Sequence, residues 1–372
     1  MKEFLLLTPG PTTVPRRILE KISLPLIHHR TKEYQGILER VNANLQKVFF
    51  TKYSVMTFAS SGTGAMEASI TNLLSKGDEV LSFSAGKWGE RYRDIARAYG
   101  LEVRSFEKAY GEAISAAEVE EALKKHPRAK AVLVTLCETS TAVLHPVQAV
   151  ARVTRDKDVL LMVDAISGLA CDPLKTDEWG VDVVVCGSQK GLMLPPGLSF
   201  VAISGKAEKR LAGSNLPKYY FNFSETLKMQ KKNDTPFTPA VSLVRGLDEA
   251  LQMILEEGVE SVWKRHAEVA DRVRKNGAAL GLELFAKAPS NALTAFVTPK
   301  GIASQDLIRY MRDTHLVAMA DGQGELKGKI VRFAHMGACS LKEAERGHEA
   351  LRDALLNAKN LEQKSQKSGV VS

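Results

Sequence analysis

Short apolar runs alternate with helical stretches through the first 200 residues of the chain. The runs that predict strands are 55–58, 79–83, 131–136, 158–163, 181–186 and 198–203. Strands that alternate with helices form a mostly parallel sheet with helices on both faces, so we predict an α/β fold. Ligands of such sheets bind beyond the carboxyl ends of the strands. The residues that follow each run are therefore the candidates for a site.

A chain of 372 residues is long enough for two domains. We predict an N-terminal arm over 1–20 and a large domain over 21–258. Strands near 282–286, 293–298 and 329–334 and helices near 303–313 and 341–357 predict a smaller α+β domain over 259–360. The polar segment 361–372 is expected to be a disordered tail.

Charge and cysteine content exclude several classes of function. The 51 Lys and Arg residues exceed the 43 Asp and Glu residues by 8, and the excess is spread along the chain. This suits anionic small molecules rather than nucleic acid. The four cysteines form no CxxC pair and the histidines no HExxH motif, so we expect no metal and reduced thiols, as in a cytoplasmic protein. The apolar run at residues 4–7 is too short for a signal peptide or membrane span.

The apolar run that ends at Cys186 leads directly to Lys190. A short run of this kind predicts a strand buried on both faces. A lysine at its end is either a solvated loop residue or a nucleophile that forms Schiff bases once burial lowers its pKa.

Three other strand ends carry polar or flat side chains. Ser61-Gly62-Thr63-Gly64 separates a strand from a helix, where backbone N–H groups bind phosphate; an ordinary helix cap is the alternative. Trp88 could stack on a planar ring or simply pack. Thr139 offers a hydroxyl that could bind a ligand or cap a turn.

Asp164 ends the apolar run 159–163. A buried carboxylate needs a cation, although a helix cap or a magnesium ligand would also explain it. An anion cradle, a flat aromatic ring, an acid for a cation and a strand-end lysine together describe a site for pyridoxal 5′-phosphate. In such a site the phosphate lies at the helix N-terminus, Asp164 keeps the pyridine nitrogen protonated and Lys190 forms the Schiff base.

With these motifs the chain resembles the class V, fold-type I aminotransferases that depend on pyridoxal 5′-phosphate. It is close to the alanine–glyoxylate and serine–pyruvate aminotransferases. The resemblance rests on Thr8-Pro9-Gly10-Pro11, Ser61-Gly62-Thr63, Gly86-Lys87-Trp88-Gly89, Glu138-Thr139-Ser140-Thr141, Val163-Asp164, Ser188-Gln189-Lys190 and Val331-Arg332-Phe333. It implies the fold of these transferases, with a seven-stranded type of sheet and a smaller C-terminal α+β domain.

The resemblance also implies residue roles. Lys190 is the Schiff-base lysine and proton shuttle, and Asp164 pairs with the pyridine nitrogen. The other implied cofactor contacts are Ser61, Gly62, Thr63, Trp88, Thr139, Ile166 and Gln189. Arg332 is implied to clamp the substrate carboxylate, with Gly10 beside the substrate; a surface arginine is the alternative. Similar enzymes are homodimers, in which Thr238 would reach the phosphate of the neighbouring subunit.

The chain departs from the animal alanine–glyoxylate enzymes in two places. A larger residue is typical there at the position of Thr63, and an aromatic hydroxyl often precedes the position of Thr238, where this chain has Thr235-Pro236-Phe237. We therefore expect differences in how the partner subunit anchors the phosphate.

The expected reaction is ping-pong transamination from a small amino acid, alanine or serine, to glyoxylate or pyruvate. Aspartate with 2-oxoglutarate and 2-aminoethylphosphonate with pyruvate are alternatives, and His28-His29-Arg30 holds candidate cations for a second carboxylate. A lyase of the cysteine desulfurase type shares the fold, but the nearby cysteine, Cys339, follows Arg332 and lies in an apolar context. A non-catalytic subunit of a larger complex is a third alternative, against which the lysine, aspartate and arginine set argues.

Overall fold

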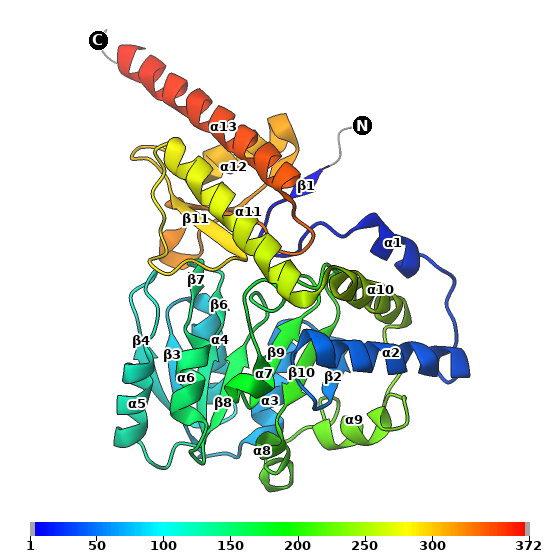
Figure 1. The fold of residues 1–372 in the computed structure, drawn as a ribbon. Coiled ribbons are helices and arrows are strands. Elements are labelled where there is room, and N and C mark those ends of the chain that lie inside the picture. Colours follow the sequence, from blue (N-terminus) through cyan, green and yellow to red (C-terminus); the bar gives the residue numbers. More distant parts are fainter. Residues whose placement is uncertain (1–3, 369–372) are drawn as a thin grey trace.

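The computed structural model describes residues 4–368, with side chains described through residue 358. Its centre is a seven-stranded sheet in the order β2-β10-β9-β8-β5-β3-β4 (Figure 1). The strands are β2 (Val55–Phe58), β3 (Glu79–Ser84), β4 (Glu102–Glu107), β5 (Ala131–Thr135), β8 (Leu160–Asp164), β9 (Val183–Gly187) and β10 (Ser199–Ile203). β10 pairs antiparallel with both β2 and β9, and all other neighbouring strands pair parallel, so the mostly parallel sheet is confirmed.

Helices cover both faces of the sheet because alternate residues of its strands are apolar on both sides. In β8, Leu161 and Val163 belong to one core, and Leu160 and Met162 belong to the other. The first core is completed by α2 (Lys32–Val48), α5 (Ala116–Lys125), α6 (Val147–Thr154) and α10 (Val241–Glu257). The second is completed by α3 (Gly62–Leu73), α4 (Lys87–Ala98), α8 (Gly205–Glu208) and α9 (Phe223–Gln230).

A second, smaller sheet lies at one end of the molecule. Its strands are β11 (Leu293–Val297), β14 (Ile330–Ala334) and β13 (Ala320–Asp321), and all neighbours are antiparallel. The helices α11 (Val259–Ala279), α12 (Ser304–His315) and α13 (Leu341–Ser368) accompany it. The N-terminal strand β1 (Leu5–Leu6) pairs with β12 (Val317–Ala318), so the first residues of the chain lie against this C-terminal part (Figure 1).

Short elements complete the chain. They are α1 (Arg16–Ile22), β6 (Cys137–Glu138), β7 (Val143–Leu144), α7 (Thr176–Trp179) and two 3-10 turns, at Leu211–Gly213 and Gly324–Leu326. The boundaries predicted for the large and small domains stay predictions. Among the helices of residues 4–368, none combines the length and the apolar composition that crossing a bilayer requires.

The structure differs from the sequence-based expectation in four elements. Strand β4 was not predicted, because it is an edge strand with exposed charged residues. Helix α9 lies in a segment without clear apolar periodicity. The strand expected over 282–286 is only a single bridge between Leu284 and Phe296.

The fourth difference concerns the expected disordered tail. Helix α13 continues to Ser368, so residues 361–368 are helical, while 369–372 lie outside the described residues. This segment consists largely of Leu, Glu, Gln and Lys, which favour helix, and it has no glycine or proline before residue 369.

Two glycine-to-alanine changes in helices test this packing. A Cβ at Gly277 would overlap the ring of Phe296, which joins α11 to β11, whereas a Cβ at Gly36 in α2 would meet nothing within 4 Å. We expect Gly277→Ala to lower the free energy of unfolding by about 1–3 kcal/mol through overpacking. Gly36→Ala should raise it by about 0.5–1 kcal/mol, because alanine loses less backbone entropy. Urea denaturation measures the free energy of unfolding of both variants. A loss of stability in both would contradict the difference in packing between Gly277 and Gly36.

Candidate active site

A cavity lies beyond the carboxyl ends of β2, β3, β8 and β9. It is lined by Ser61, Gly62, Thr63, Trp88, Arg91, Asp164, Ile166, Ser167, Gln189 and Lys190. The structure therefore brings eight of the residues predicted to form the site into one cavity and adds Arg91 and Ser167. The sequence could have predicted Arg91 as a site residue, because it lies three residues after Trp88 and so on the same face of helix α4.

Lys190 is buried, with 7% of its surface exposed. Its Nζ donates a hydrogen bond to the backbone oxygen of Pro9. Burial lowers the pKa of Lys190 to about 8, and the charge of Arg332 acts in the same direction. The alternative of a solvated lysine is therefore wrong, and the amine is available as a nucleophile closer to neutral pH than an ordinary lysine.

Gly10 lies directly against the Lys190 side chain. A Cβ at this position would overlap the end of that side chain, and Gly10 also has a φ of +104°. Both facts favour glycine. The hydroxyl of Thr12 donates to the backbone oxygen of Lys190 at 3.5 Å. The N-terminal segment therefore closes over the lysine.

Asp164 is the last residue of β8, and its side chain is buried. Burial, helped by the nearby Glu138 carboxylate, raises the pKa of Asp164 to about 7. One carboxylate oxygen accepts a hydrogen bond from the backbone N–H of Ile166 at 2.9 Å. The magnesium alternative gains no support, because residues 4–368 contain no group of three or more His, Cys, Asp or Glu that could hold a metal ion. A carboxylate in this position is suited to a cationic ligand atom.

An anion cradle lies at the start of α3. Ser61 is the residue before the helix, but its side chain makes no capping hydrogen bond, so an ordinary cap does not explain it. A Cβ at Gly62 would lie 2.5 Å from Ile166 Cδ1, so only glycine fits there. The side-chain oxygen of Gln189 is buried and has no hydrogen-bond partner among the described residues. The N–H groups of the helix N-terminus suit an anion such as phosphate, and of the Gln189 amide only the NH2 end can donate to one.

Trp88 is positioned by a carboxylate that the sequence did not single out as a site residue. One oxygen of buried Glu138 accepts from the N–H groups of Trp88 and Gly89 at 3.0 and 3.1 Å. The other accepts from the N–H and the hydroxyl of Ser140 at 3.1 and 2.6 Å. Burial raises the pKa of Glu138, while these bonds lower it. Glu138 thus joins the start of α4 to the Thr139 loop.

Arg91 lies between the tryptophan and the anion cradle. Its guanidinium is 4.3 Å from the centre of the Trp88 ring and donates to the hydroxyl of Thr63 at 3.1 Å. It therefore adds a positive charge to the cavity beside Thr63, where a phosphate would lie.

Arg332 comes from β14 of the smaller sheet and meets the Thr139 loop. It is 6% exposed, so the surface alternative is wrong. Its guanidinium donates to the backbone oxygens of Thr139 and Asp321 at 2.9 and 2.8 Å. Burial lowers its pKa to about 10, well above neutral pH, so it stays charged. A buried, oriented guanidinium suits a carboxylate ligand.

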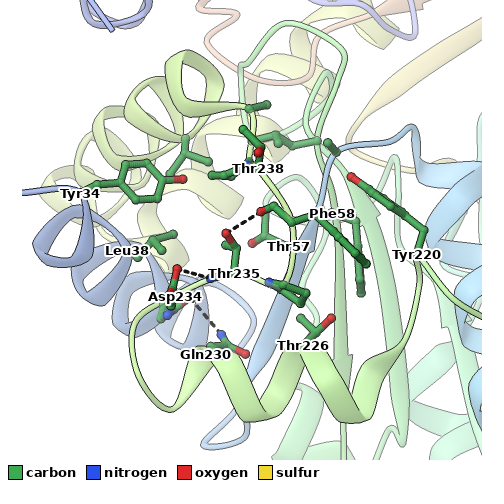
Figure 2. A pocket seen from close by; sticks show the side chains of 18 residues that line it. Tyr34, Leu38, Thr57, Phe58, Tyr220, Thr226, Gln230, Asp234, Thr235 and Thr238 are labelled. Carbon is green, nitrogen blue, oxygen red and sulfur yellow. Dashed lines mark hydrogen bonds between the residues drawn. The ribbon is translucent and has the colours of Figure 1, made fainter. Parts of the chain in front are cut away.

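Thr238 is not in the Lys190 cavity. Figure 2 shows it in a second pocket, together with Tyr34, Phe58 and Tyr220. The two pockets share no lining residue. Within one chain, Thr238 and Lys190 are therefore separate.

The residues of the Lys190 cavity fit pyridoxal 5′-phosphate. Among the described side chains, two buried polar atoms of the lining residues have no hydrogen-bond partner, namely Gln189 Oε1 and Trp88 Nε1. The same holds for Thr139 Oγ1, although Thr139 does not line the cavity. Buried polar groups are normally paired, so these atoms mark a ligand surface. The glycine at the cradle, the carboxyl of Asp164 and the amine of Lys190 match the remaining groups of this cofactor.

The desulfurase alternative needs a reactive thiol on a loop near the substrate arginine. Cys339 is 9% exposed, and burial raises its pKa to about 12. A thiol with so high a pKa is a poor nucleophile at neutral pH.

Comparisons with known proteins agree with this geometry. The chain is 36% identical to an L-aspartate–glyoxylate aminotransferase of Paracoccus denitrificans over 89% of this chain and 85% of that protein. It is 34% identical to a serine–glyoxylate aminotransferase of Methylorubrum extorquens over 89% of this chain and 86% of that protein. The crystal structure of an alanine–glyoxylate aminotransferase from Nostoc sp. matches with a TM-score of 0.92 and 29% identity, over 95% and 96% of the two chains.

The family model for aminotransferase class V matches residues 5–336, which include every site residue described above. The expected fold type and the expected resemblance are thus confirmed. With Lys190 and Asp164 in one cavity and Arg332 buried against the Thr139 loop, this chain belongs to the class V aminotransferases and is a transaminase.

Proposed function

We propose that this transaminase uses pyridoxal 5′-phosphate held through Lys190 to move an amino group from alanine or serine to glyoxylate or pyruvate. The observation that carries the proposal is the buried Lys190 amine, whose pKa is lowered to about 8. It lies in one cavity with Asp164 and the Ser61–Thr63 cradle. The reaction proceeds in two half-reactions, in which the enzyme first takes the amino group and then passes it on.

Different residues of the site would bind different groups of the cofactor. Ser61, Gly62, Thr63 and Gln189 would hold the phosphate, and Trp88 would cover the ring. Thr139 would bond the ring hydroxyl, and Asp164 would hold a proton at the ring nitrogen. When bound, the cofactor supplies an electron sink that stabilises negative charge at the α-carbon of the substrate.

Lys190 acts on the substrate itself. Its amine removes the proton from the α-carbon as a general base, which requires an unprotonated amine and therefore benefits from the lowered pKa. Arg332 binds the α-carboxylate and so orients the α-carbon toward Lys190. The Pro9-Gly10 segment packs against the lysine and helps to exclude water from the reacting atoms.

The names of the three relatives described above all include glyoxylate, which supports it as the acceptor here. A small donor is favoured because Arg91 is already engaged with Trp88 and Thr63. Aspartate is the second candidate donor, because Arg91 lines the same cavity and one relative is an aspartate–glyoxylate enzyme. His28-His29-Arg30 is a weaker source of a second cation, since Arg30 pairs with Asp234.

We further propose a homodimer in which Thr238 reaches the cofactor phosphate of the partner subunit. Thr238 lies apart from the Lys190 cavity of its own chain. Its loop also carries Phe237, which stacks on Tyr220, and the neighbouring Tyr219 is 83% exposed. Exposed aromatic side chains of this kind are typical of surfaces that bind another protein.

A donor panel tests the reaction. Alanine, serine and aspartate are each assayed with glyoxylate, pyruvate and 2-oxoglutarate. We expect the highest kcat/KM for alanine or serine with glyoxylate, and parallel double-reciprocal lines. Lys190→Ala should abolish turnover and the covalent link to the cofactor. Borohydride reduction followed by peptide mass analysis detects this link in the wild-type protein. A preference for aspartate that Arg91→Gln removes would support the second candidate, whereas full activity of Lys190→Ala would refute the proposal.

The pH dependence of cofactor attachment tests the state of Lys190. Only the unprotonated amine attacks a carbonyl, and the folded protein lowers the pKa from 10.5 to about 8. The rate at which apoprotein binds pyridoxal 5′-phosphate covalently should therefore rise with pH and level off above about 8. Arg332→Gln removes a charge that lowers the pKa of Lys190, so the midpoint of the pH profile of this variant should move to higher pH. A midpoint near 10.5 in the wild-type protein would show that the amine is solvated.

Mixed dimers test the role of Thr238. Thr238→Ala should weaken cofactor binding by about 5–30-fold, the effect of one or two kcal/mol. If Thr238 acts across the dimer, pairing a Lys190→Ala subunit with a Thr238→Ala subunit leaves one site with every wild-type residue. That mixed dimer should bind cofactor at this site with wild-type affinity. The weak affinity of the Thr238→Ala homodimer would instead mean that Thr238 acts within its own chain.

A further inference from the structure

A completely buried carboxylate connects the two sheets. Asp172 belongs to the segment that follows β8 and Asp164, and none of its surface is exposed. One oxygen accepts from the hydroxyl of Ser290 at 2.5 Å and the other from the N–H of Asn291 at 2.8 Å. Both partners lie just before β11 of the smaller sheet. The reaction proposed above uses none of these groups.

On one side, the Asp172 segment packs against the catalytic lysine. A Cβ at Gly191, the residue after Lys190, would overlap the backbone oxygen of Leu169 and lie 3.1 Å from Cys171 Sγ. The backbone N–H of Asp172 donates to the oxygen of Gly168 at 2.8 Å, which closes the segment into a turn. A movement of Asp172 would therefore displace the backbone next to Lys190.

On the other side, Ser290 leads to Arg332. The Ser290 hydroxyl accepts from the N–H of Ala292 at 3.0 Å, immediately before β11 begins. Strand β11 pairs with β14, where Ala295 lies opposite Arg332. The N–H of Ser290 also donates to the oxygen of Ala142 at 3.0 Å, close to the Thr139 loop that Arg332 contacts. The position of Ser290 thus sets the position of the strand that holds Arg332.

Stability alone does not explain a charge at this place. Burial raises the pKa of Asp172 to about 6, so the folded protein holds the ionised form less readily than water does. The charge of Arg274 and the two hydrogen bonds offset this only in part. A buried carboxylate with strict partners is instead a means of fixing a geometry.

We propose that Asp172 is a positioning residue that sets the distance between the Lys190 amine and the Arg332 guanidinium, and thereby the affinity for the substrate carboxylate. The inference rests on the proposed roles of Lys190 and Arg332. Asp172 does not line the Lys190 cavity. Its effect is transmitted through Ser290 and β11 to one side and through Gly191 to the other.

Asp172→Asn tests the proposal in the full-length enzyme loaded with cofactor. The amide keeps the shape but loses the charge and one acceptor. We expect KM for the amino donor, and the spectroscopic Kd for 2-methylalanine, which has no α-hydrogen, to rise by about 5–30-fold. Cofactor affinity should stay at the wild-type value, and kcat should change far less than KM. Ser290→Ala removes the hydrogen bond between Ser290 and Asp172. It should raise KM and the Kd for 2-methylalanine in the same way, which keeps the test decisive even if Asp172→Asn folds poorly.

Asp182 is a matched control. It is a buried carboxylate that accepts from the N–H of Leu161 at 2.9 Å and the hydroxyl of Ser204 at 2.8 Å, all within the large sheet and its connections. Asp182→Asn should lower the melting temperature without raising KM or the Kd for 2-methylalanine. Equal effects of the two aspartate variants, or an unchanged KM in Asp172→Asn and Ser290→Ala, would overturn the proposal.

Hydrogen exchange separates this inference from the proposed function. Asp172→Asn should increase the exchange of backbone amides in residues 288–297, and Asp182→Asn should not. This result does not depend on the substrate. If wild-type protein neither binds 2-methylalanine nor transfers amino groups, the proposed function fails, whereas an active enzyme with unchanged exchange and KM in Asp172→Asn would refute only the role of Asp172.

Discussion

The burial of the Lys190 ammonium group is the constraint on which the site depends. A charged amine loses hydration when it is buried, and the pKa falls to about 8. Strand β9 carries the lysine to the edge of the sheet, and the Pro9-Gly10 segment covers it from the other end of the chain. The loss of hydration makes the amine easier to deprotonate, which is what a nucleophile and general base requires.

Three buried carboxylates hold segments in and around the site, and each has a different role. Asp164 is suited to a cationic ligand atom. Glu138 accepts from the N–H group of Trp88 at the start of α4, and Asp172 connects the large sheet to the smaller one. All three accept hydrogen bonds from backbone N–H groups, which partly replace the water they lose. Because the carboxylates bond to the backbone, they fix the position of chain segments as well as of side chains.

The sequence was most informative at the ends of strands. A run of apolar residues followed by Asp164 or Lys190 places that side chain at the edge of a parallel sheet, so their position could be predicted from periodicity. Their role was suggested only by their occurrence together with the Ser61 loop and Trp88. Arg332 was found only through the family resemblance, because nothing local distinguishes it from a surface arginine. Glu138 and Asp172 were missed as structural centres, since their partners lie about 50 and 119 residues away in the chain.

The sequence by itself determined the α/β fold, the order of six of the seven strands of the large sheet along the chain and the residues that follow them. The apolar period of each segment is a local property, so local residues decide it. Tertiary structure decided which of these residues meet and what burial does to their pKa values. It closed Gly10 over Lys190, brought Arg332 from β14 to Thr139 and left Thr238 in a separate pocket. Such contacts join distant segments, and their energies depend on desolvation, which exists only once the chain has folded.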